Sequence, residues 1–208
     1  MKIEISPSFK IHIFIVMISL SISSCAVQPK LVSRADWISA TTRDYENVTK
    51  DEVLESADYL LRLVDGNDFS IAHQTDSLQA RRQWVSYVLI FGGFGTDYWD
   101  IRASEVNGKI KTSVIVSTQS QTAGATEISI SGGTPSLSPS FGDAIKNPAV
   151  YKLFWARMDY LLGKSDVWLT CSDASKKFNV NTFSDGMEVL CNPLNIADNF
   201  PTRVIKKD

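Results

Sequence analysis

One histidine follows the first 24 residues of the chain, and it is the first residue to consider for catalysis. Phe69, Ile71 and His73 alternate with small or polar residues, which is typical of a β-strand with one buried face. A general base needs a nucleophile or an acid within hydrogen-bond reach, and no spacing assigns such a partner to His73. We therefore expect a hydrogen-bonded histidine in the core or at a sheet edge. A lone histidine also gives no reason to expect a metal site.

A glycine-rich stretch, Gly92-Gly93-Phe94-Gly95-Thr96, has the composition of a phosphate-binding loop. Such loops need a strand before them and a helix after them, and P-loops also need a lysine followed by serine or threonine. Strand-like aromatic residues follow this stretch instead, and no lysine is suitably placed. The sequence therefore predicts a break between strands and no nucleotide or other cofactor.

Paired charges occur at three further places. Asp65 and Asp68 flank the expected end of a helix, where they are typical of turn chemistry. Asp97 and Asp100 lie three residues apart on an expected strand, so their side chains point to opposite faces. Neither pair predicts general acid–base catalysis. Residues 81 and 82, both arginine, lie close to a tryptophan and are interpreted as a ridge on the sheet surface. The alternative is a cation–π contact or a contact with an anionic ligand.

The most apolar stretch of the body runs from residue 84 to residue 91 and contains one small polar residue. A strand with one solvated face does not need so many apolar residues. We favour a strand buried on both faces, because the core is the commoner place for such runs. The alternative is a projecting tip, residues 90–94, that meets a partner protein or the bilayer. The partner-binding candidates are then Trp84, Ile90, Phe91 and Phe94.

Local signals predict a helix that begins after Thr49. Thr49 and Glu52 form a capping box, and apolar residues recur at helical spacing from Val53 to Val64. Gly66 then provides a C-terminal stop. This is the most strongly marked helix in the chain.

Period-two segments between this helix and a later one predict four antiparallel strands. Asn107-Gly108 predicts a two-residue hairpin, because both turn positions favour positive φ. Asn147 and Pro148 form the N-cap and first turn of a second helix, which Gly163 stops. The predicted fold is α+β: an antiparallel four-stranded meander flanked by two helices (α-β-β-β-β-α), with a disulfide-tied irregular C-terminal tail. The expected strands are 69–74, 78–87, 98–104 and 109–117.

The first 25 residues carry the features of a secretory signal. Lys2 and Lys10 precede an apolar run, residues 11–22, that ends in small residues. Twelve residues of helix reach about 18 Å, too short for a hydrocarbon core of about 30 Å. A cleaved signal therefore fits this segment better than a spanning helix.

Ile22-Ser23-Ser24-Cys25 resembles the lipobox of bacterial lipoproteins, with isoleucine where that motif usually has leucine. The resemblance implies cleavage before Cys25 and lipidation of Cys25. Ala26 follows Cys25, at the position where an aspartate often marks inner-membrane retention in enteric bacteria. The resemblance therefore also implies that the protein is located at the periplasmic face of the outer membrane. The expected organisation is a signal peptide at 1–24, a lipidated tether at 25–47 and a single α+β domain at 48–208. An alternative for 25–47 is an arm in which Trp37 docks on the body.

The predicted export bears on the two remaining cysteines, and the net charge bears on the class of partner. Cys171 and Cys191 are expected to form a disulfide in an oxidising compartment. The formal net charge is −2, and removing residues 1–24 with Lys2, Lys10 and Glu4 makes it −3. A mildly acidic body without a run of basic residues argues against a nucleic-acid partner.

These observations favour a non-enzymatic envelope lipoprotein that acts as a scaffold or accessory subunit of a membrane-associated assembly. At the level of layer order, the expected fold resembles small periplasmic lipoproteins that assist outer-membrane assembly machines, an analogy of fold alone. The membrane, through Cys25, and an envelope protein are the expected partners. One alternative is a periplasmic carrier or binding protein for a lipid-like or small hydrophobic ligand. A hydrolase that uses His73 ranks third.

Overall fold

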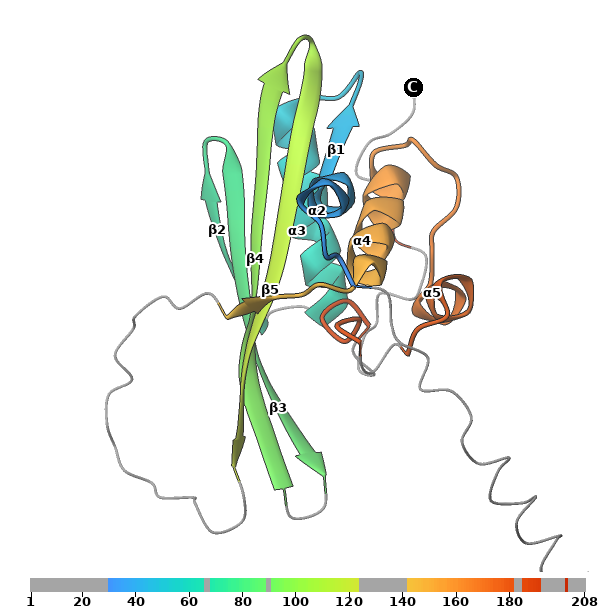
Figure 1. Ribbon diagram of the computed structural model, residues 1–208. Helices are drawn as coiled ribbons and strands as arrows, with labels where there is room; N and C mark the ends of the chain where they lie inside the picture. Colours follow the sequence, from blue (N-terminus) through green and yellow to red (C-terminus); the bar gives the residue numbers. More distant parts are fainter. Residues whose placement is uncertain are drawn as a thin grey trace, which may run out of the picture.

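The computed structural model describes residues 30–65, 68–88, 91–123, 142–181, 185–191 and 201, without the side chains of 65, 86–88, 91–92 and 121–123. These residues form one antiparallel sheet with strand order β1-β5-β4-β3-β2, and β6 also pairs with β5. The helices lie together on one side of the sheet (Figure 1). The elements are α2 (Arg34–Thr41), β1 (Thr42–Tyr45), α3 (Lys50–Asp65), β2 (Phe69–Gln74), β3 (Ser77–Val88), β4 (Phe91–Val106), β5 (Lys109–Ala123), β6 (Asp143–Ala144), α4 (Pro148–Leu161) and α5 (Cys171–Phe178).

The predicted capping box begins helix α3. The backbone N–H of Glu52 donates to the Thr49 hydroxyl (3.2 Å), and the backbone N–H of Thr49 donates to the Glu52 carboxylate (2.6 Å). Two donors that the first helical turn leaves without an intrahelical partner are thereby satisfied. The predicted stop at Gly66 lies outside the described residues.

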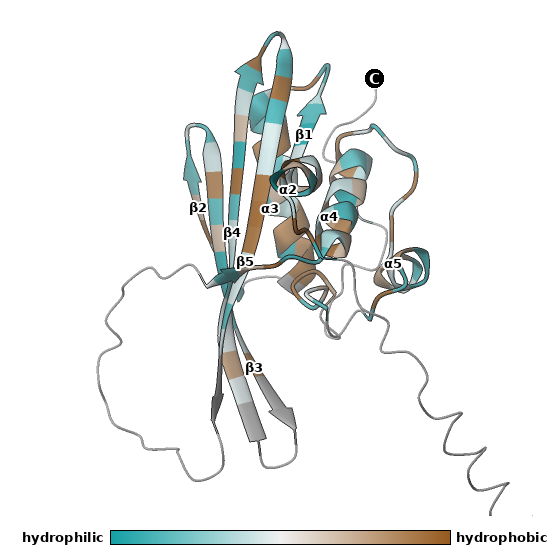
Figure 2. Ribbon diagram, viewed as in Figure 1, coloured by the Kyte–Doolittle hydropathy of each residue, from teal (hydrophilic) through white to brown (hydrophobic). Residues whose placement is uncertain are grey.

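The two helices expected from sequence and the hairpin at 107–108 are confirmed. Asn107 and Gly108 have φ angles of 54° and 72°, as the two-residue turn requires. Asn147 caps α4 by accepting the backbone N–H of Ala149 (2.9 Å), and Pro148 occupies the first turn. In Figure 2, hydrophilic and hydrophobic residues alternate along the strands, so one face of the sheet packs on α3 and α4.

Aromatic side chains fill the space between sheet and helices. Trp99 of β4 is fully buried, and its ring centroid lies 5.5 Å from that of Phe154 on α4. Phe154 in turn contacts Trp155 edge-on at 4.9 Å. Such offset and edge-on contacts are favourable beyond the burial of their apolar area. This cluster fixes the sheet against α4.

The predicted numbers of strands and helices were too small. Within the described residues there are six strands and four helices instead of four and two. The missed strands β1 and β6 have four and two residues, and α2 and α5 have eight each. Segments so short show too few repeats for a period to be recognised. The general α+β description with an antiparallel sheet holds.

Residues 34–45 belong to the folded body and do not continue a tether. Strand β1 pairs with β5, with Thr42 opposite Ser113. The Trp37 ring packs edge-on against Tyr151 of α4 at 5.8 Å. The docked arm, the alternative for this region, therefore describes these residues better than the tether does.

The expected break at residues 92–95 was wrong, because β4 runs through it without interruption. Gly95 lies opposite Trp84 of β3. A Cβ atom at Gly95 would come within 2.5 Å of the Trp84 ring and 2.3 Å of the carbonyl oxygen of Gln119. The glycine is needed for close packing inside a strand, which composition alone does not distinguish from a turn.

The C-terminal tail is partly helical, which corrects the expectation of an irregular segment. Thr170 caps α5 by accepting the backbone N–H of Asp173 (3.1 Å). The predicted disulfide between Cys171 and Cys191 is present. Arg157 of α4 is fully buried and donates to the carbonyl oxygens of Leu169 (3.1 Å) and Leu190 (3.3 Å). Each of these leucines lies within two residues of one cysteine of the disulfide. Buried carbonyl groups that regular structure leaves unpaired are thus satisfied.

No helix in the described part of the chain combines the length and the apolar character that crossing a bilayer requires.

Candidate functional site

Strands β3, β4 and β5 run well past the helices and form a narrow three-stranded ribbon (Figure 1). We call this part the extension and define it as residues 83–88, 91–96 and 119–123. Strand β2 pairs with β3 as far as Arg82, and β6 pairs with β5 at residues 117–118. Beyond these points, among the described residues, no further strand lies beside the ribbon.

Two apolar side chains of the extension are exposed on the face turned away from the helices. Val85 lies directly opposite Phe94 in the β3–β4 ladder. Val85 is 63% exposed and Phe94 is 45% exposed. The favoured interpretation of residues 84–91 as a strand buried on both faces is therefore wrong at Val85, because no helix of the described chain covers that face. A projecting tip is consistent with this exposure.

Trp84 has a different environment from the other proposed partner-binding residues. Its ring lies over Gly95 on the opposite face from Val85, and its indole Nε1–H donates to the Asp97 carboxylate (3.1 Å). Trp84 thus stabilises the root of the extension. Ile90 lies outside the described residues, and of Phe91 only the backbone is described.

The root of the extension contains a buried ion pair that sequence reasoning missed. Arg82 Nη2 lies 2.8 Å from Asp97 Oδ2, and both residues are at most 3% exposed. Arg82 also contacts the carbonyl oxygen of Glu188 (3.4 Å), which connects the sheet with the C-terminal segment. The expected surface ridge was wrong for Arg82, because strand alternation puts it on the inner face with Leu78. Arg81 is exposed on the other face.

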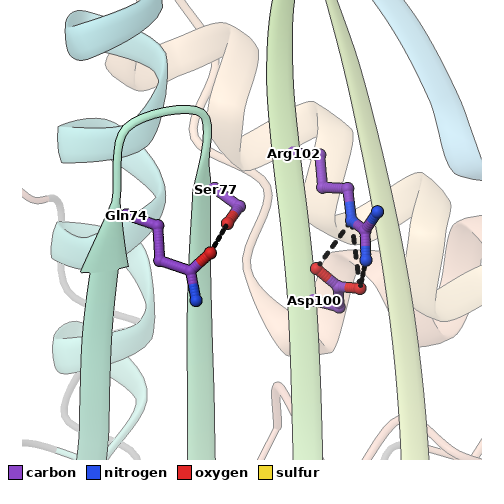
Figure 3. Close-up of polar contacts among 4 residues, drawn as sticks. All are labelled: Gln74, Ser77, Asp100 and Arg102. Carbon is purple, nitrogen blue, oxygen red and sulfur yellow. Dashed lines mark hydrogen bonds and ion pairs between the residues drawn. The ribbon is translucent and has the colours of Figure 1, made fainter.

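The outer face of the sheet above the extension is polar. Arg102 holds Asp100 with two of its nitrogen atoms at 2.8 and 3.2 Å, and the Ser77 hydroxyl donates to Gln74 (3.3 Å) (Figure 3). Arg102 remains 67% exposed in its side chain. This polar environment is ordinary for a solvated sheet face. Single apolar side chains such as Ile115 are also exposed on this face, whereas Val85 and Phe94 lie directly opposite each other and form an apolar pair.

His73 is a hydrogen-bonded histidine at the sheet edge, as expected. Its Nε2 lies 2.6 Å from the Asp58 carboxylate of α3, and its side chain is 48% exposed. Its hydrogen bond therefore joins β2 to α3 and does not reach a serine or cysteine. Among the described residues, no group of three or more histidine, cysteine, aspartate or glutamate side chains could hold a metal ion.

Comparison with family models, curated proteins and solved structures gave no match. No relative therefore lends its function to this chain.

The sequence did contain a signal for the exposed pair. The alternation that buries Leu78 and Ala80 assigns odd-numbered residues of β3 to the opposite face, which includes Val85. The alternation that buries Trp99 and Ile101 likewise assigns Asp97 to the inner face. Its partner Arg82 carried no local signal, because the ion pair depends on the register of β3 with β4.

Proposed function

We propose that the chain is a lipid-anchored scaffold or accessory subunit of the bacterial envelope. Cys25 would attach it to the membrane, and the extension would dock a partner protein. The observation that carries this proposal is the exposed Val85–Phe94 pair on a ribbon that projects beyond the helices. Aromatic residues, phenylalanine included, are enriched in protein interfaces, and a few side chains near the centre of a contact supply most of the binding energy.

The proposed location rests on the lipobox resemblance of residues 22–25 and on the disulfide. Disulfides persist in the periplasm and other oxidising compartments and are rare in the cytosol. The Cys171–Cys191 bridge is therefore compatible with an exported chain. The periplasmic face of the outer membrane is the location that the residue after Cys25 favours by resemblance.

The extension is suited to docking because its backbone is already ordered as strand. Continuous pairing holds Phe94 between β3 and β5, opposite Val85 and Gln121. A side chain presented on an ordered strand loses less conformational entropy on binding than one on a free loop. A lipid anchor would add a second attachment and raise the effective concentration at the membrane.

The test of docking compares two sites on the same sheet face. Ile115 is 42% exposed on β5 and serves as the matched control for Phe94. We expect Phe94→Asp to reduce stoichiometric co-purification of an envelope protein at least tenfold, whereas Ile115→Asp retains it. Circular dichroism should show both variants folded. Equal recovery of the partner with both variants would contradict docking at the extension.

The test of anchoring is separate. We expect Cys25→Ser to move the protein from the membrane fraction to the soluble envelope fraction, and mass spectrometry of the wild type to show acyl chains on the N-terminal cysteine. Two or more chains give stable attachment, since each buried methylene contributes about 0.8 kcal/mol. A wild-type chain without acyl groups would refute the anchor.

A further inference from the structure

A hollow of about 520 Å³ lies where the N-terminal entry, β6 and the C-terminal segment meet. Its volume falls in the range of about 300–1,000 Å³ that is common for small-molecule sites. Charged side chains from three distant segments of the chain line it. They are Lys30, Asp143, Lys146, Asp185 and Glu188.

These five charges share one hollow without pairing with each other. Ion pairs occur elsewhere on the protein, for example between Arg43 and Asp159, but none in the described structure joins a lysine of the hollow to one of its carboxylates. Asp185 accepts the backbone N–H of Asn181 (3.1 Å). The carboxylate of Glu188 likewise accepts backbone N–H groups, of Gly186 and of Glu188 itself. The two ammonium groups and the three carboxylates are thus not neutralised by one another, and they line the hollow as charges of both signs.

A buried amide provides a second, independent observation. Asn147, which lines the hollow, is 8% exposed. Its Oδ1 accepts the backbone N–H of Ala149, whereas its Nδ2 has no hydrogen-bond partner. Buried polar groups are almost always paired in proteins, and an unpaired one needs an explanation. Nδ2 is covered by its neighbours, and an anionic ligand group that displaces a lining side chain would supply the missing acceptor.

The hollow also lies close to the proposed anchor. The backbone N–H of Leu31 donates to the carbonyl oxygen of Lys146 (2.8 Å), so the chain joins the body at the rim of the hollow. The six residues from Cys25 to Leu31 reach at most about 20 Å when fully extended. If Cys25 is lipidated, as proposed above, the hollow stays within reach of phospholipid headgroups.

We propose that this hollow binds a phosphoethanolamine group. The ammonium group would contact the carboxylates of Asp143, Asp185 and Glu188. The phosphate would contact Lys30, Lys146 and the unpaired amide of Asn147. A membrane phospholipid or a soluble phosphoethanolamine ester could carry this group, and the recognition chemistry is the same for both.

Titration of the full chain with headgroup compounds tests the recognition. We expect saturable binding of glycerophosphoethanolamine, followed by calorimetry, at least tenfold tighter than binding of glycerophosphoglycerol, which lacks the amine, and of ethanolamine, which lacks the phosphate. Absence of saturable binding, or equal affinity for all three compounds, would overturn the proposal.

Paired variants locate the binding. Asp143→Asn with Glu188→Gln, and Lys30→Gln with Lys146→Gln, should each weaken binding of glycerophosphoethanolamine at least fivefold. Glu105→Gln with Lys111→Gln removes exposed charges on other parts of the chain and should leave the affinity unchanged. Pocket variants that bind as tightly as the wild type would show that the hollow is not the site.

Vesicles distinguish the two sources of the ligand. The Cys25→Ser chain, which has no acyl chains, should bind phosphatidylethanolamine–phosphatidylglycerol vesicles more tightly than pure phosphatidylglycerol vesicles if the group belongs to a phospholipid. Equal binding to both vesicles, with saturable binding of the soluble compound, identifies a soluble ester instead. The titration with soluble headgroup compounds does not depend on the anchor. An acylated wild-type protein that fails to bind glycerophosphoethanolamine would reject the hollow as a binding site and leave the anchor unaffected. A wild-type protein that binds this compound but carries no acyl groups would reject the anchor and leave the hollow unaffected.

Discussion

At the scale of single residues, the ion pair at the root of the extension is the strongest constraint. Burial removes Arg82 and Asp97 from water, which is costly for each charge, and their contact at 2.8 Å offsets part of that cost. Trp84 depends on the same carboxylate through its indole N–H. The three residues therefore act as one unit, and removing one charge leaves the other buried and unpaired.

We expect Asp97→Asn to destabilise the fold by about 3–5 kcal/mol, since breaking a buried ion pair on one side has that effect. Urea unfolding of the oxidised protein measures it. The control, Asp100→Asn, breaks the exposed contact with Arg102 and should cost less than about 1 kcal/mol. Similar losses in both variants would contradict the buried role of Asp97.

A second residue-scale prediction concerns Asp159, which pairs with Arg43 at 2.8 Å. Burial raises the pKa of Asp159, and the nearby Arg43 opposes that rise. A carboxyl group whose pKa is raised by folding stabilises the fold at low pH, and this contribution is lost as the pH rises through the folded pKa. Removal of Arg43 should raise the pKa of Asp159 further.

We therefore expect Arg43→Met to lower the free energy of unfolding by about 1 kcal/mol at neutral pH. The effect is small because the ion pair is partly exposed. The loss should shrink towards about pH 4, near the ordinary pKa of an aspartate. Denaturation curves across this range measure the difference. In an Asp159→Asn background the pH dependence of the Arg43→Met effect should vanish. A pH dependence that persists there would assign it to another group.

At the scale of elements, the disulfide and Arg157 hold α5 and the C-terminal segment against α4. Cys171 begins α5 and Cys191 lies 20 residues further on. Arg157 contacts the backbone on both sides of this bridge. The segment that reaches Arg82 through Glu188 thus depends on a covalent bond within the tail.

We expect the double variant Cys171→Ser, Cys191→Ser to be about 3 kcal/mol less stable, from the entropy of a loop of this size in the unfolded chain. Thermal and urea unfolding measure the loss. Alkylation of the denatured wild type before and after reduction should reveal two additional thiols after reduction. Identical thiol counts would refute the bridge.

Local signals in the sequence predicted the elements whose causes are local. The capping box at Thr49, the cap at Asn147 and the turn at Asn107 each act within four residues, and all three were found in place. Arg82 was misplaced because its burial requires Asp97, which lies 15 residues away on another strand. Gly95 was misplaced because the ring that excludes a Cβ comes from Trp84.

The candidate sites were harder to predict than the helices for the same reason. The exposed pair at Val85 and Phe94 depends on where the helices end relative to the strands. The charged hollow joins residue 30 with residues 143–147 and 185–188, and no periodicity or motif relates these segments. Contacts between segments so far apart arise from topology, which composition and spacing do not report.

At the scale of the whole molecule, the two candidate sites are neighbours. Thr118 of β5 lines the hollow and pairs with Asp143 of β6, immediately before the extension begins. The point where the N-terminal segment joins the body, near Lys30 and Leu31, and the root of the extension thus adjoin. A lipid-anchored chain would place the start of its docking ribbon beside the membrane and leave the outer sheet face open.

The unbroken course of β4 has a mechanical consequence. At about 3.3 Å per residue, its 16 residues span about 50 Å, and they connect Phe94 near the tip with Trp99 in the core. A pull along the strands at the tip would load the hydrogen bonds of the ladder in shear, many at once. The extension would therefore move as a rigid unit with the core of the sheet. A partner that displaces the tip would tilt the rest of the folded domain.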